Sequence, residues 1–248
     1  MAMALRSIPI NVTQLRGACS ACSLHELCLS AGLKAHEMDR LDRLINRRRS
    51  MRRGDYLYRA GAVLQSLYAV RAGFFKSCVL HDDGREQVAG FHMTGELLGM
   101  DAIGSSKHLC DAVALEDSEV CEIPFADLEF LSREIPALQR NFHAIMSREI
   151  ARDYGVMLLL GSMRAEERLA AFLLNLSRRF AARGYSPTRF NLRMTREEIG
   201  SYLGLKLETI SRAFSHFQNE GLIAVQNKSV EIKDLKRLSG LIGQVPER

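Results

Sequence analysis

Three cysteines lie close together near the start of the chain, at Cys19, Cys22 and Cys28. The spacing C-x2-C-x5-C puts three sulfur ligands on one short loop, close enough to share a metal centre. Tetrahedral zinc and an iron-sulfur cubane each commonly take four protein ligands. The loop therefore predicts a metal centre that needs a fourth ligand, and the spacing alone does not choose between the two kinds. Cys78, Cys110 and Cys121 are the available candidates.

A second group of residues with chemical potential lies near the C-terminus. Thr195 and Glu198 form a capping-box pattern that begins a helix over 196–203, and Gly204 permits a sharp turn after it. A second helix is predicted over 206–219, which makes the segment a helix-turn-helix. Residues 221–232 then predict a small hairpin, or wing.

The outward side of the second helix suits the major groove of DNA. An arginine can bond guanine O6 and N7, a carboxylate can accept from cytosine N4, and a serine hydroxyl can do either. The alternative is that Glu208 and Arg212, four residues apart, form only a solvated helix pair contributing roughly 0.3 kcal/mol. We expect Leu207, Ile210, Phe214 and Phe217 to face inward, and Glu208, Ser211, Arg212 and His216 to face outward.

The elements that must position these residues fall into two kinds. From about Gly54 to Phe130, short apolar segments alternate with Gly and Asp turns, which is typical of antiparallel strands in a barrel or jelly roll. Residues 67–70 and 118–123 have the apolar pattern of such strands. After Pro136 the pattern becomes helical, with one long helix predicted over 137–161 and another over 165–183.

The long helix carries an apolar stripe at steps of four and three residues. The stripe either packs on the protein's own barrel or forms the seam of a dimer. The position of the long helix between the β-rich part and the helix-turn-helix favours the dimer. Its members are Phe142, Met146, Ile150, Met157 and Leu160.

Asp153 interrupts this stripe between Ile150 and Met157. In a two-fold dimer the two copies of this carboxylate approach each other and oppose association. We therefore predict that Ile150, Asp153 and Met157 control dimerisation, with Asp153 keeping the metal-free protein monomeric. The alternative is that Asp153 points to solvent or pairs with Arg148 or Arg152.

Composition agrees with a two-part DNA-binding protein. The chain has 248 residues, 47% of them apolar, which is enough for two modest domains. Its net charge is +5, and residues 164–248 hold 15 Lys and Arg against 9 Asp and Glu. That surplus suits a polyanion. We find no secretory signal, no membrane-spanning stretch, no dinucleotide fingerprint and no nucleophile-base set, so we expect a cytoplasmic protein that is not an enzyme.

The sequence resembles the CRP/FNR superfamily of transcription regulators, and most closely its branch of fumarate and nitrate reduction regulators. The resemblance covers nearly the whole chain. Its DNA-binding part, from Arg164 to Val225, rests on AEERLAAFLLNLSRRF, MTREEIGSYLGL and LETISRAFSHFQNEGL, and its β-rich part on GREQVAGFHMTGELLGMDAIG. Lys206 stands where the family usually has a small or hydroxylated residue.

The resemblance implies an α+β fold with an N-terminal antiparallel β-roll of the cyclic-nucleotide-binding type, a long dimerisation helix and a C-terminal winged helix-turn-helix. The implied domains are a cysteine-rich iron-sulfur loop over 1–30, a sensory β-roll over 31–136, a dimerisation helix over 137–163 and a DNA-binding domain over 164–248.

The resemblance also implies the ligands of the metal centre. The segment VCEIPF matches the family's distant ligand segment, so Cys121 joins Cys19, Cys22 and Cys28 around a 4Fe-4S cluster. In that branch the cluster assembles without oxygen, promotes dimerisation and DNA binding, and is lost in air. We expect the two remaining cysteines to be small buried side chains. These are Cys78 and Cys110.

The implied function is oxygen-responsive transcription regulation by a homodimer that binds a palindromic site in double-stranded DNA. In the family the equivalents of Glu208, Ser211 and Arg212 read the bases. Residues 82–85 and 116–118 resemble surfaces that touch RNA polymerase, the alternative being a solvated hairpin turn.

Three other functions compete with this one. Residues 95–97 resemble the start of a cyclic-nucleotide phosphate cassette, but His108 and Leu109 hold the positions of its Arg and Ser, and they lack the charge and hydroxyl that a buried phosphate requires. We therefore expect no cyclic nucleotide. A zinc-stabilised regulator blind to oxygen is the second competitor, and an iron-sulfur electron carrier is the third.

Overall fold

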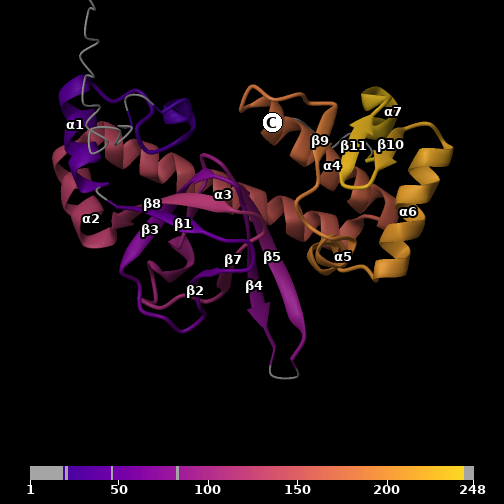
Figure 1. Cartoon of the computed structure of the whole chain (residues 1–248), viewed down its shortest axis with the longest axis horizontal. Helices are drawn as coiled ribbons and strands as arrows, with labels where there is room; N and C mark the ends of the chain where they lie inside the picture. Colours follow the sequence, from indigo (N-terminus) through magenta and orange to yellow (C-terminus); the bar gives the residue numbers. More distant parts are fainter. Residues whose placement is uncertain (1–18, 20–21, 46, 82–83, 243–248) are drawn as a thin grey trace, which may run out of the picture.

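The computed structural model describes residues 19, 22–45, 47–81 and 84–242. In these ranges the chain forms a β-rich N-terminal part and a mainly helical C-terminal part, joined by one long helix (Figure 1). The fold is therefore α+β, as the sequence predicts. None of the described helices is long and apolar enough to cross a membrane.

Two antiparallel four-stranded sheets build the β-roll, with strand orders β1-β8-β3-β6 and β2-β7-β4-β5. Buried residues from both sheets, such as Val70, Phe75 and Val120, form a single core cluster. The strands predicted at 67–70 and 118–123 are parts of β3 and β8. The strands are β1 (Arg47–Met51), β2 (Tyr56–Tyr58), β3 (Ser66–Ala72), β4 (Phe74–Leu80), β5 (Glu86–Met93), β6 (Leu97–Leu98), β7 (Asp111–Ala114) and β8 (Ser118–Pro124).

The turn between β3 and β4 requires a glycine. Gly73 has φ +94°, and a Cβ on it would lie 2.0 Å from Oγ of Ser118, the first residue of β8. The same hydroxyl accepts a hydrogen bond from the backbone N–H of Phe74 at 3.3 Å. The β3–β4 turn is thus tied to the strand that carries Cys121.

Two helices flank the β-roll, and a second core cluster joins them to the long helix. α1 (Ala35–Leu44) buries Met38 and Leu41, and α2 (Phe125–Glu134) buries Leu128 and Leu131. The sequence pattern did not indicate α1, and the β-rich region was predicted to extend to Phe130. That extension is wrong, because the chain becomes helical at Phe125.

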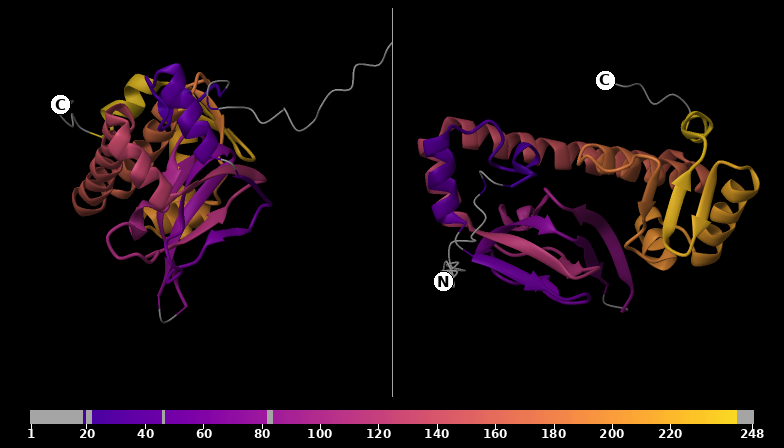
Figure 2. Two further views of the ribbon diagram at one scale, coloured as in Figure 1. Left: turned by 90° about the vertical axis from the view of Figure 1, so that its left-hand side faces the viewer. Right: turned by 45° about the horizontal axis from the view of Figure 1, so that its top comes forward.

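The long helix α3 (Pro136–Ser162) extends from the β-roll to the C-terminal part (Figure 2). The sequence predicts the bounds of this helix to within one residue at each end. Pro136 stands at its first turn, where a missing backbone N–H costs nothing. Its buried residues are Leu138, Ile145 and Leu159, so most of its second half is open to solvent in the single chain.

The C-terminal part is a winged helix-turn-helix with a small sheet of order β10-β11-β9. The predicted wing is the β10–β11 hairpin, whereas β9 was not predicted. α4 ends at Ala181, two residues before the predicted end. The elements are α4 (Ala165–Ala181), β9 (Arg189–Asn191), α5 (Arg196–Leu203), α6 (Leu207–Asn219), β10 (Ile223–Gln226), β11 (Ser229–Ile232) and α7 (Leu235–Gly240).

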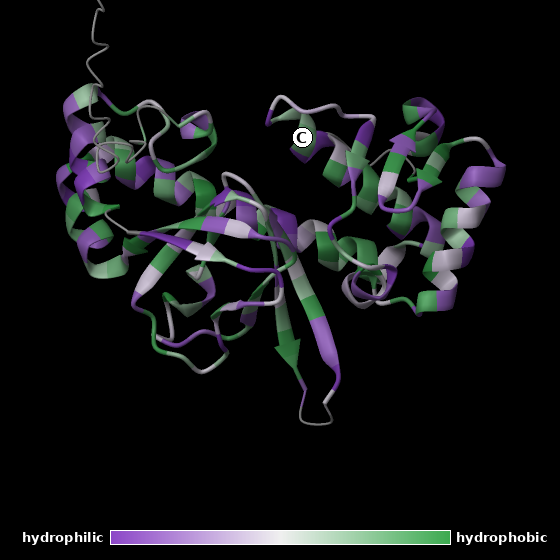
Figure 3. Ribbon diagram, in the orientation of Figure 1, coloured by the Kyte–Doolittle hydropathy of each residue, from purple (hydrophilic) through white to green (hydrophobic). Residues whose placement is uncertain are grey.

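The two parts share a hydrophobic core. Phe74, Val88 and Phe91 of the β4–β5 hairpin belong to the same buried cluster as Phe172 of α4 and Ile199 of α5. Figure 3 shows β4 largely apolar along its length and β5 hydrophilic toward the hairpin tip. The apolar side chains of this hairpin therefore complete the interior of the DNA-reading part.

Candidate functional site

The three N-terminal cysteines lie on a tight loop that is closed by backbone hydrogen bonds three residues apart. The N–H of Cys22 bonds the carbonyl of Cys19 at 3.1 Å, and the N–H of Cys28 bonds the carbonyl of His25 at 3.3 Å. Between them lies a short 3-10 helix over His25–Leu27. Such a loop keeps the backbone of the three cysteines compact.

Side chains from two helices hold this loop. Asn141 of α3 donates its amide to the carbonyls of Leu29 and Ala31 at 2.9 and 2.6 Å. Asp42 of α1 accepts a hydrogen bond from the backbone N–H of Cys19 at 2.5 Å. The side chain of Leu29 is fully buried in the core cluster that contains residues of α3. The position of the cysteine loop is therefore coupled to α3.

Cys121 lies on β8 beside this loop, although it is far away in the sequence. Cys19, Cys28 and Cys121 pack against the same apolar cluster. Burial, together with the nearby Cys121 and Cys22, raises the pKa of the Cys28 thiol to about 11. Burial likewise raises the pKa values of Cys19 and Cys121, and each of these thiols interacts electrostatically with another member of the group. Cys121 therefore lies close to the N-terminal cysteine loop.

The donor set fits a metal centre in its chemistry. Four free thiols, each half-buried, are what zinc or an iron-sulfur cluster takes from a protein. Within the described residues, however, no group of three or more His, Cys, Asp or Glu side chains is already arranged to hold a metal ion. The thiols are near one another without being gathered around a common point.

The other two cysteines are buried, as expected. Cys78 is 2% exposed and Cys110 is 9% exposed. The thiol of Cys110 donates to Asp101 at 3.5 Å, and burial raises its pKa to about 12.

The predicted helix-turn-helix forms as the sequence indicates. The Thr195 hydroxyl accepts from the N–H of Glu198 at 3.1 Å, and the Glu198 carboxylate accepts from the N–H of Thr195 at 2.7 Å. Gly204, with φ +63°, ends α5 in the left-handed conformation. A Cβ on Gly200 would lie 2.6 Å from the carbonyl oxygen of Leu205. The turn is therefore tight enough to require glycine at both positions.

α6 places most of the predicted side chains where they were expected. Ile210, Phe214 and Phe217 are fully buried, whereas Glu208, Arg212 and His216 are exposed and Ser211 is half-buried. Within the described chain no ion pair joins Glu208 to Arg212. Glu208 and Arg212 are therefore not paired with each other, whereas His216 of the same face lies 3.8 Å from the carboxylate of Glu166 in α4.

One inward prediction on α6 is wrong. Leu207 is 45% exposed, because it is the first residue of the helix and lies beyond the edge of the core. Lys206 is the N-cap residue rather than part of the helix.

The comparisons with known proteins agree with both parts of this geometry. Residues 167–241 match the Crp-like helix-turn-helix domain family, and residues 48–134 match the cyclic nucleotide-binding domain family. The transcriptional regulatory protein btr of Bordetella pertussis is 49% identical over 226 residues, covering 91% of this chain and 93% of its own. The fumarate and nitrate reduction regulatory protein of Escherichia coli is 49% identical over 225 residues, covering 91% and 90%. The chain belongs to the CRP/FNR family of transcription regulators.

A solved structure of the CRP/FNR type supports the same conclusion. FixK2 from Bradyrhizobium japonicum aligns with a TM-score of 0.74 and 30% identity, over 81% of this chain and 98% of its own. The matched relatives are transcription regulators rather than enzymes, and the helix-turn-helix makes DNA the partner of this CRP/FNR chain.

Two of the three cassette positions of this CRP/FNR chain, Glu96 and His108, have partners within the protein. His108 is 4% exposed and stacks on Tyr58 with ring centroids 3.7 Å apart, while Leu109 is 64% exposed. The Glu96 carboxylate bonds arginines of α3 and α4. None of these side chains offers a free cationic group to a phosphate.

Two residues that hold helices or the cysteine loop in position in this CRP/FNR chain were not predicted from the sequence. Arg168 of α4 donates to the carbonyls of Leu160, Met163 and Leu203 at 2.8, 2.9 and 3.0 Å, and so joins the ends of α3 and α5. Asn141 holds the cysteine loop. Both lie in helices with regular apolar patterns, and those patterns do not indicate what a polar side chain will contact.

The predicted dimer-control residues lie on the open side of α3. Ile150 is 54% exposed and Met157 is 58% exposed. Tyr154 and Leu158, which were not predicted, extend this apolar surface, whereas the predicted Phe142 and Met146 are half-buried. We call Ile150, Tyr154, Met157 and Leu158 the α3 stripe.

Asp153 is exposed beside the α3 stripe. Of its two suggested partners, Arg152 instead pairs with Glu96 at 3.5 Å and with Glu149. In the described part of the chain Asp153 has no ion pair.

Proposed function

We propose that this protein is an oxygen-responsive regulator in which Cys19, Cys22, Cys28 and Cys121 hold a 4Fe-4S cluster. The carrying observation is that Cys121 of β8 packs against the same apolar cluster as Cys19 and Cys28 of the N-terminal cysteine loop. The similarity to proteins named fumarate and nitrate reduction regulatory protein supports the proposal. A cluster of this kind, when bound, supplies positive charge to four thiolates and makes the site sensitive to small oxidants.

The protein's own residues hold the loop in place before a metal centre binds. Burial raises the pKa values of Cys19, Cys28 and Cys121, so a bound cation has to offset this cost to form the thiolates. Binding a metal centre releases the thiol protons and draws the sulfurs together, so the order of the loop depends on the metal. Asn141 of α3 bonds the backbone of the loop, and Leu29 of the loop packs in the core cluster that contains residues of α3. An ordered loop should therefore also fix the position of α3.

We propose that α3 is the dimer seam. Two copies of the α3 stripe would bury each other across a two-fold axis, which is how symmetric dimers are built. The same axis brings two Asp153 side chains together. The cluster-bound loop would then favour the dimer, and the Asp153 pair would oppose it when the cluster is absent.

We further propose that the domain over 164–248 reads a palindromic DNA site with Glu208, Ser211 and Arg212. Two reading helices related by a two-fold axis require half-sites about one helical turn, roughly 34 Å, apart, as in dimeric helix-turn-helix proteins generally. The basic surplus of residues 164–248 supplies the phosphate contacts.

Two statements about other partners belong to the same proposal. The protein binds no cyclic nucleotide, because Glu96, His108 and Leu109 supply no free cation for the phosphate. For RNA polymerase we propose two surfaces, one at Gly84 and Arg85 and another at Glu116 to Ser118. Asp82 and Asp83, which belong to the first surface, lie outside the described residues.

Iron and acid-labile sulfide analysis of protein purified without oxygen tests the cluster. We expect about four iron atoms and about four sulfides per chain, and loss of both in air. Zinc in place of iron would support the oxygen-blind regulator instead.

Serine variants of the individual cysteines test the ligand assignment. Replacement of Cys19, Cys22, Cys28 or Cys121 should abolish iron binding, whereas Cys110→Ser is the matched control and should keep it. Loss of iron from the Cys110 variant together with its retention in the Cys121 variant would show that the assignment is wrong.

A further inference from the structure

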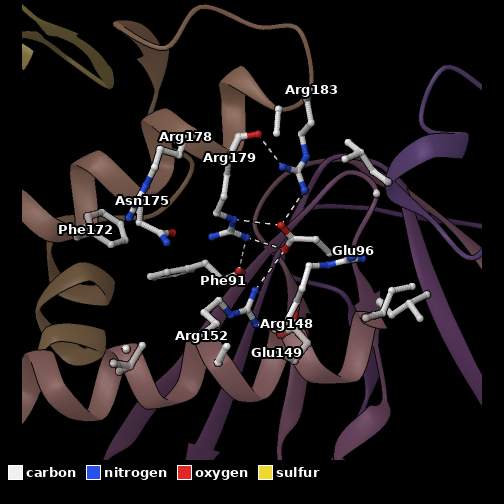
Figure 4. A pocket seen from close by; sticks show the side chains of 18 of the residues that line it. Phe91, Glu96, Arg148, Glu149, Arg152, Phe172, Asn175, Arg178, Arg179 and Arg183 are labelled. Atoms are coloured by element: carbon white, nitrogen blue, oxygen red, sulfur yellow. Dashed lines mark hydrogen bonds and ion pairs between the residues drawn. The ribbon is translucent and has the colours of Figure 1, made fainter. Parts of the chain in front are cut away.

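One carboxylate at the junction of the two parts is held by arginines from two helices. Glu96, which follows β5, accepts from Nε and Nη2 of Arg179 at 3.0 and 2.6 Å and from Nη2 of Arg183 at 2.7 Å. Nη1 of Arg152 lies 3.5 Å from the same carboxylate. Arg152 belongs to α3, Arg179 belongs to α4, and Arg183 follows α4 (Figure 4). We call these four residues the Glu96 cluster.

The Glu96 cluster is shielded from water. The side chain of Glu96 is 14% exposed and that of Arg183 is 6% exposed. Charge pairs are strong where the dielectric is low, and removal of one partner leaves buried charge uncompensated. The contact between Glu96 and α4 is therefore a specific joint, unlike the weak ion pairs of an exposed surface.

The same arginines also bond the backbone next to Glu96. Arg179 donates to the carbonyl of Phe91 at 2.7 Å, and Arg183 donates to the carbonyl of Thr94 at 2.5 Å. The segment from β5 to Glu96 is thus held to the end of α4 at several points. A shift of this segment has to move α4 or break these bonds.

The segment also lies close to the cysteine loop. Gly95 has φ +88°, and a Cβ on it would lie 3.2 Å from Cβ of Leu27, the residue before Cys28. Glu26 and Leu27 line a cavity of about 710 Å³ together with Glu96, Arg152 and Arg179. The cysteine loop therefore lies directly beside the Glu96 cluster.

We propose that Glu96 is a positioning residue that transmits the state of the cysteine loop to the DNA-reading domain. When the loop reorganises, Leu27 changes its contact with Gly95, Glu96 shifts against Arg179 and Arg183, and α4 changes its orientation. This route acts within one chain and does not need a second copy of the α3 stripe, although Arg152 of the Glu96 cluster lies on α3. It rests on the proposed function, because the loop must change with its metal centre.

The test compares the parent protein with Glu96→Gln, which is nearly the same size but lacks the charge. Affinity for a palindromic DNA duplex is measured by fluorescence anisotropy for protein containing and lacking iron. We divide the DNA affinity of the protein that contains iron by that of the protein that lacks it. In Glu96→Gln this ratio should be at least about fivefold smaller than in the parent, which is the lower end of typical allosteric couplings. The iron content should match that of the parent. Glu129→Gln, on the exposed face of α2, is the matched control and should keep the parent's ratio.

A second variant guards against misfolding caused by excess buried positive charge. Glu96→Gln combined with Arg183→Gln removes one charge of each sign and should fold as the parent does by circular dichroism. Hydrogen exchange should become faster at residues 94–96 and 179–185 in both variants. An unchanged affinity ratio in the folded double variant, with unchanged exchange, would overturn the role of Glu96.

Measurements on the parent protein distinguish failure of the transmission through Glu96 from failure of the proposed function. A parent that contains no iron, or whose DNA affinity is the same with and without iron, would refute the proposed function and the transmission together. The exchange measurement would still decide whether Glu96 holds α4 to the β-roll.

Discussion

Gly200 lies against Leu205 so closely that a Cβ on the glycine would be 2.6 Å from the carbonyl oxygen of Leu205. The contact brings α5 against the turn that leads into α6. The same Cβ would lie 3.5 Å from Cγ1 of Ile210 in α6. The angle between the two helices, and with it the direction of the polar face of α6, therefore depends on the absence of one methyl group.

Gly200→Ala should consequently destabilise the protein by about 1–3 kcal/mol, the usual cost of overpacking. Chemical denaturation monitored by circular dichroism measures the effect. Gly240→Ala, in α7, is the matched control, since a Cβ there meets nothing within 4 Å. Alanine in that helix should be neutral or slightly stabilising. Equal stabilities of the two variants would contradict the close approach.

Arg212→Ala should weaken binding to the preferred DNA site by about 1–3 kcal/mol and relax the preference at one base position. The exposed guanidinium has no ion pair with Glu208 in the described chain, so the loss reflects contact with DNA. Fluorescence anisotropy against a set of single-base variants of the site measures it.

Lys228→Ala in the wing is the control for this measurement. Lys228 is exposed at the β10–β11 turn, where a phosphate contact is the expected role. Its loss should weaken binding to all sequences by a similar factor. If Arg212→Ala behaves in the same uniform way, Arg212 positions the protein on DNA without reading a base.

Asp153→Ala should strengthen dimerisation of the protein that lacks its cluster. Two carboxylates about 4 Å apart repel by about 1 kcal/mol even in water, and the variant removes this repulsion beside the α3 stripe. Sedimentation in air measures the monomer fraction. Asp39→Ala, on the exposed side of α1, should leave that fraction unchanged. A monomer fraction of Asp153→Ala no smaller than that of the parent would rule the repulsion out.

The Glu96 cluster should make stability depend on pH in the acid range. Burial alone raises the pKa of Glu96, but Arg179 and Arg152 outweigh it and lower the pKa to about 2. An unfolded glutamate titrates near 4.3. The stabilisation is therefore complete above about pH 5 and is lost as the pH falls toward 2. Its size is on the order of 3 kcal/mol.

The unfolding free energies of the parent and of Glu96→Gln measure this dependence. Their difference should be largest near neutral pH and should shrink between about pH 5 and about pH 3. A difference that stays constant over this range would show that the ionised carboxylate does not stabilise the fold.

Local signals were sufficient to predict α5 to the residue. Thr195, Glu198 and Gly204 act on the backbone within a few residues. In the structure Thr195 and Glu198 cap the start of α5, and Gly204 ends it. The bounds of α3 and the strands β3 and β8 were predictable for the same reason. Leu207 was misplaced because apolar spacing shows which face a residue belongs to and not where the core ends.

Long-range contacts were not predictable. Glu96 meets Arg179 and Arg183, and Asn141 meets Leu29, across distances in sequence that no local pattern spans. The resemblance assigned Cys121 to the cysteine group, and spacing alone did not. In each case the partner is determined by how the helices pack on the β-roll.

The core shared by the β4–β5 hairpin and the DNA-reading part bears on how the molecule melts. Phe74 and Val88 are interior to a cluster that also contains buried residues of α4, α5 and α6. Separation of the two parts would expose apolar surface on both. Heating should therefore produce a single calorimetric peak in which the β-roll and the winged helix lose their structure together.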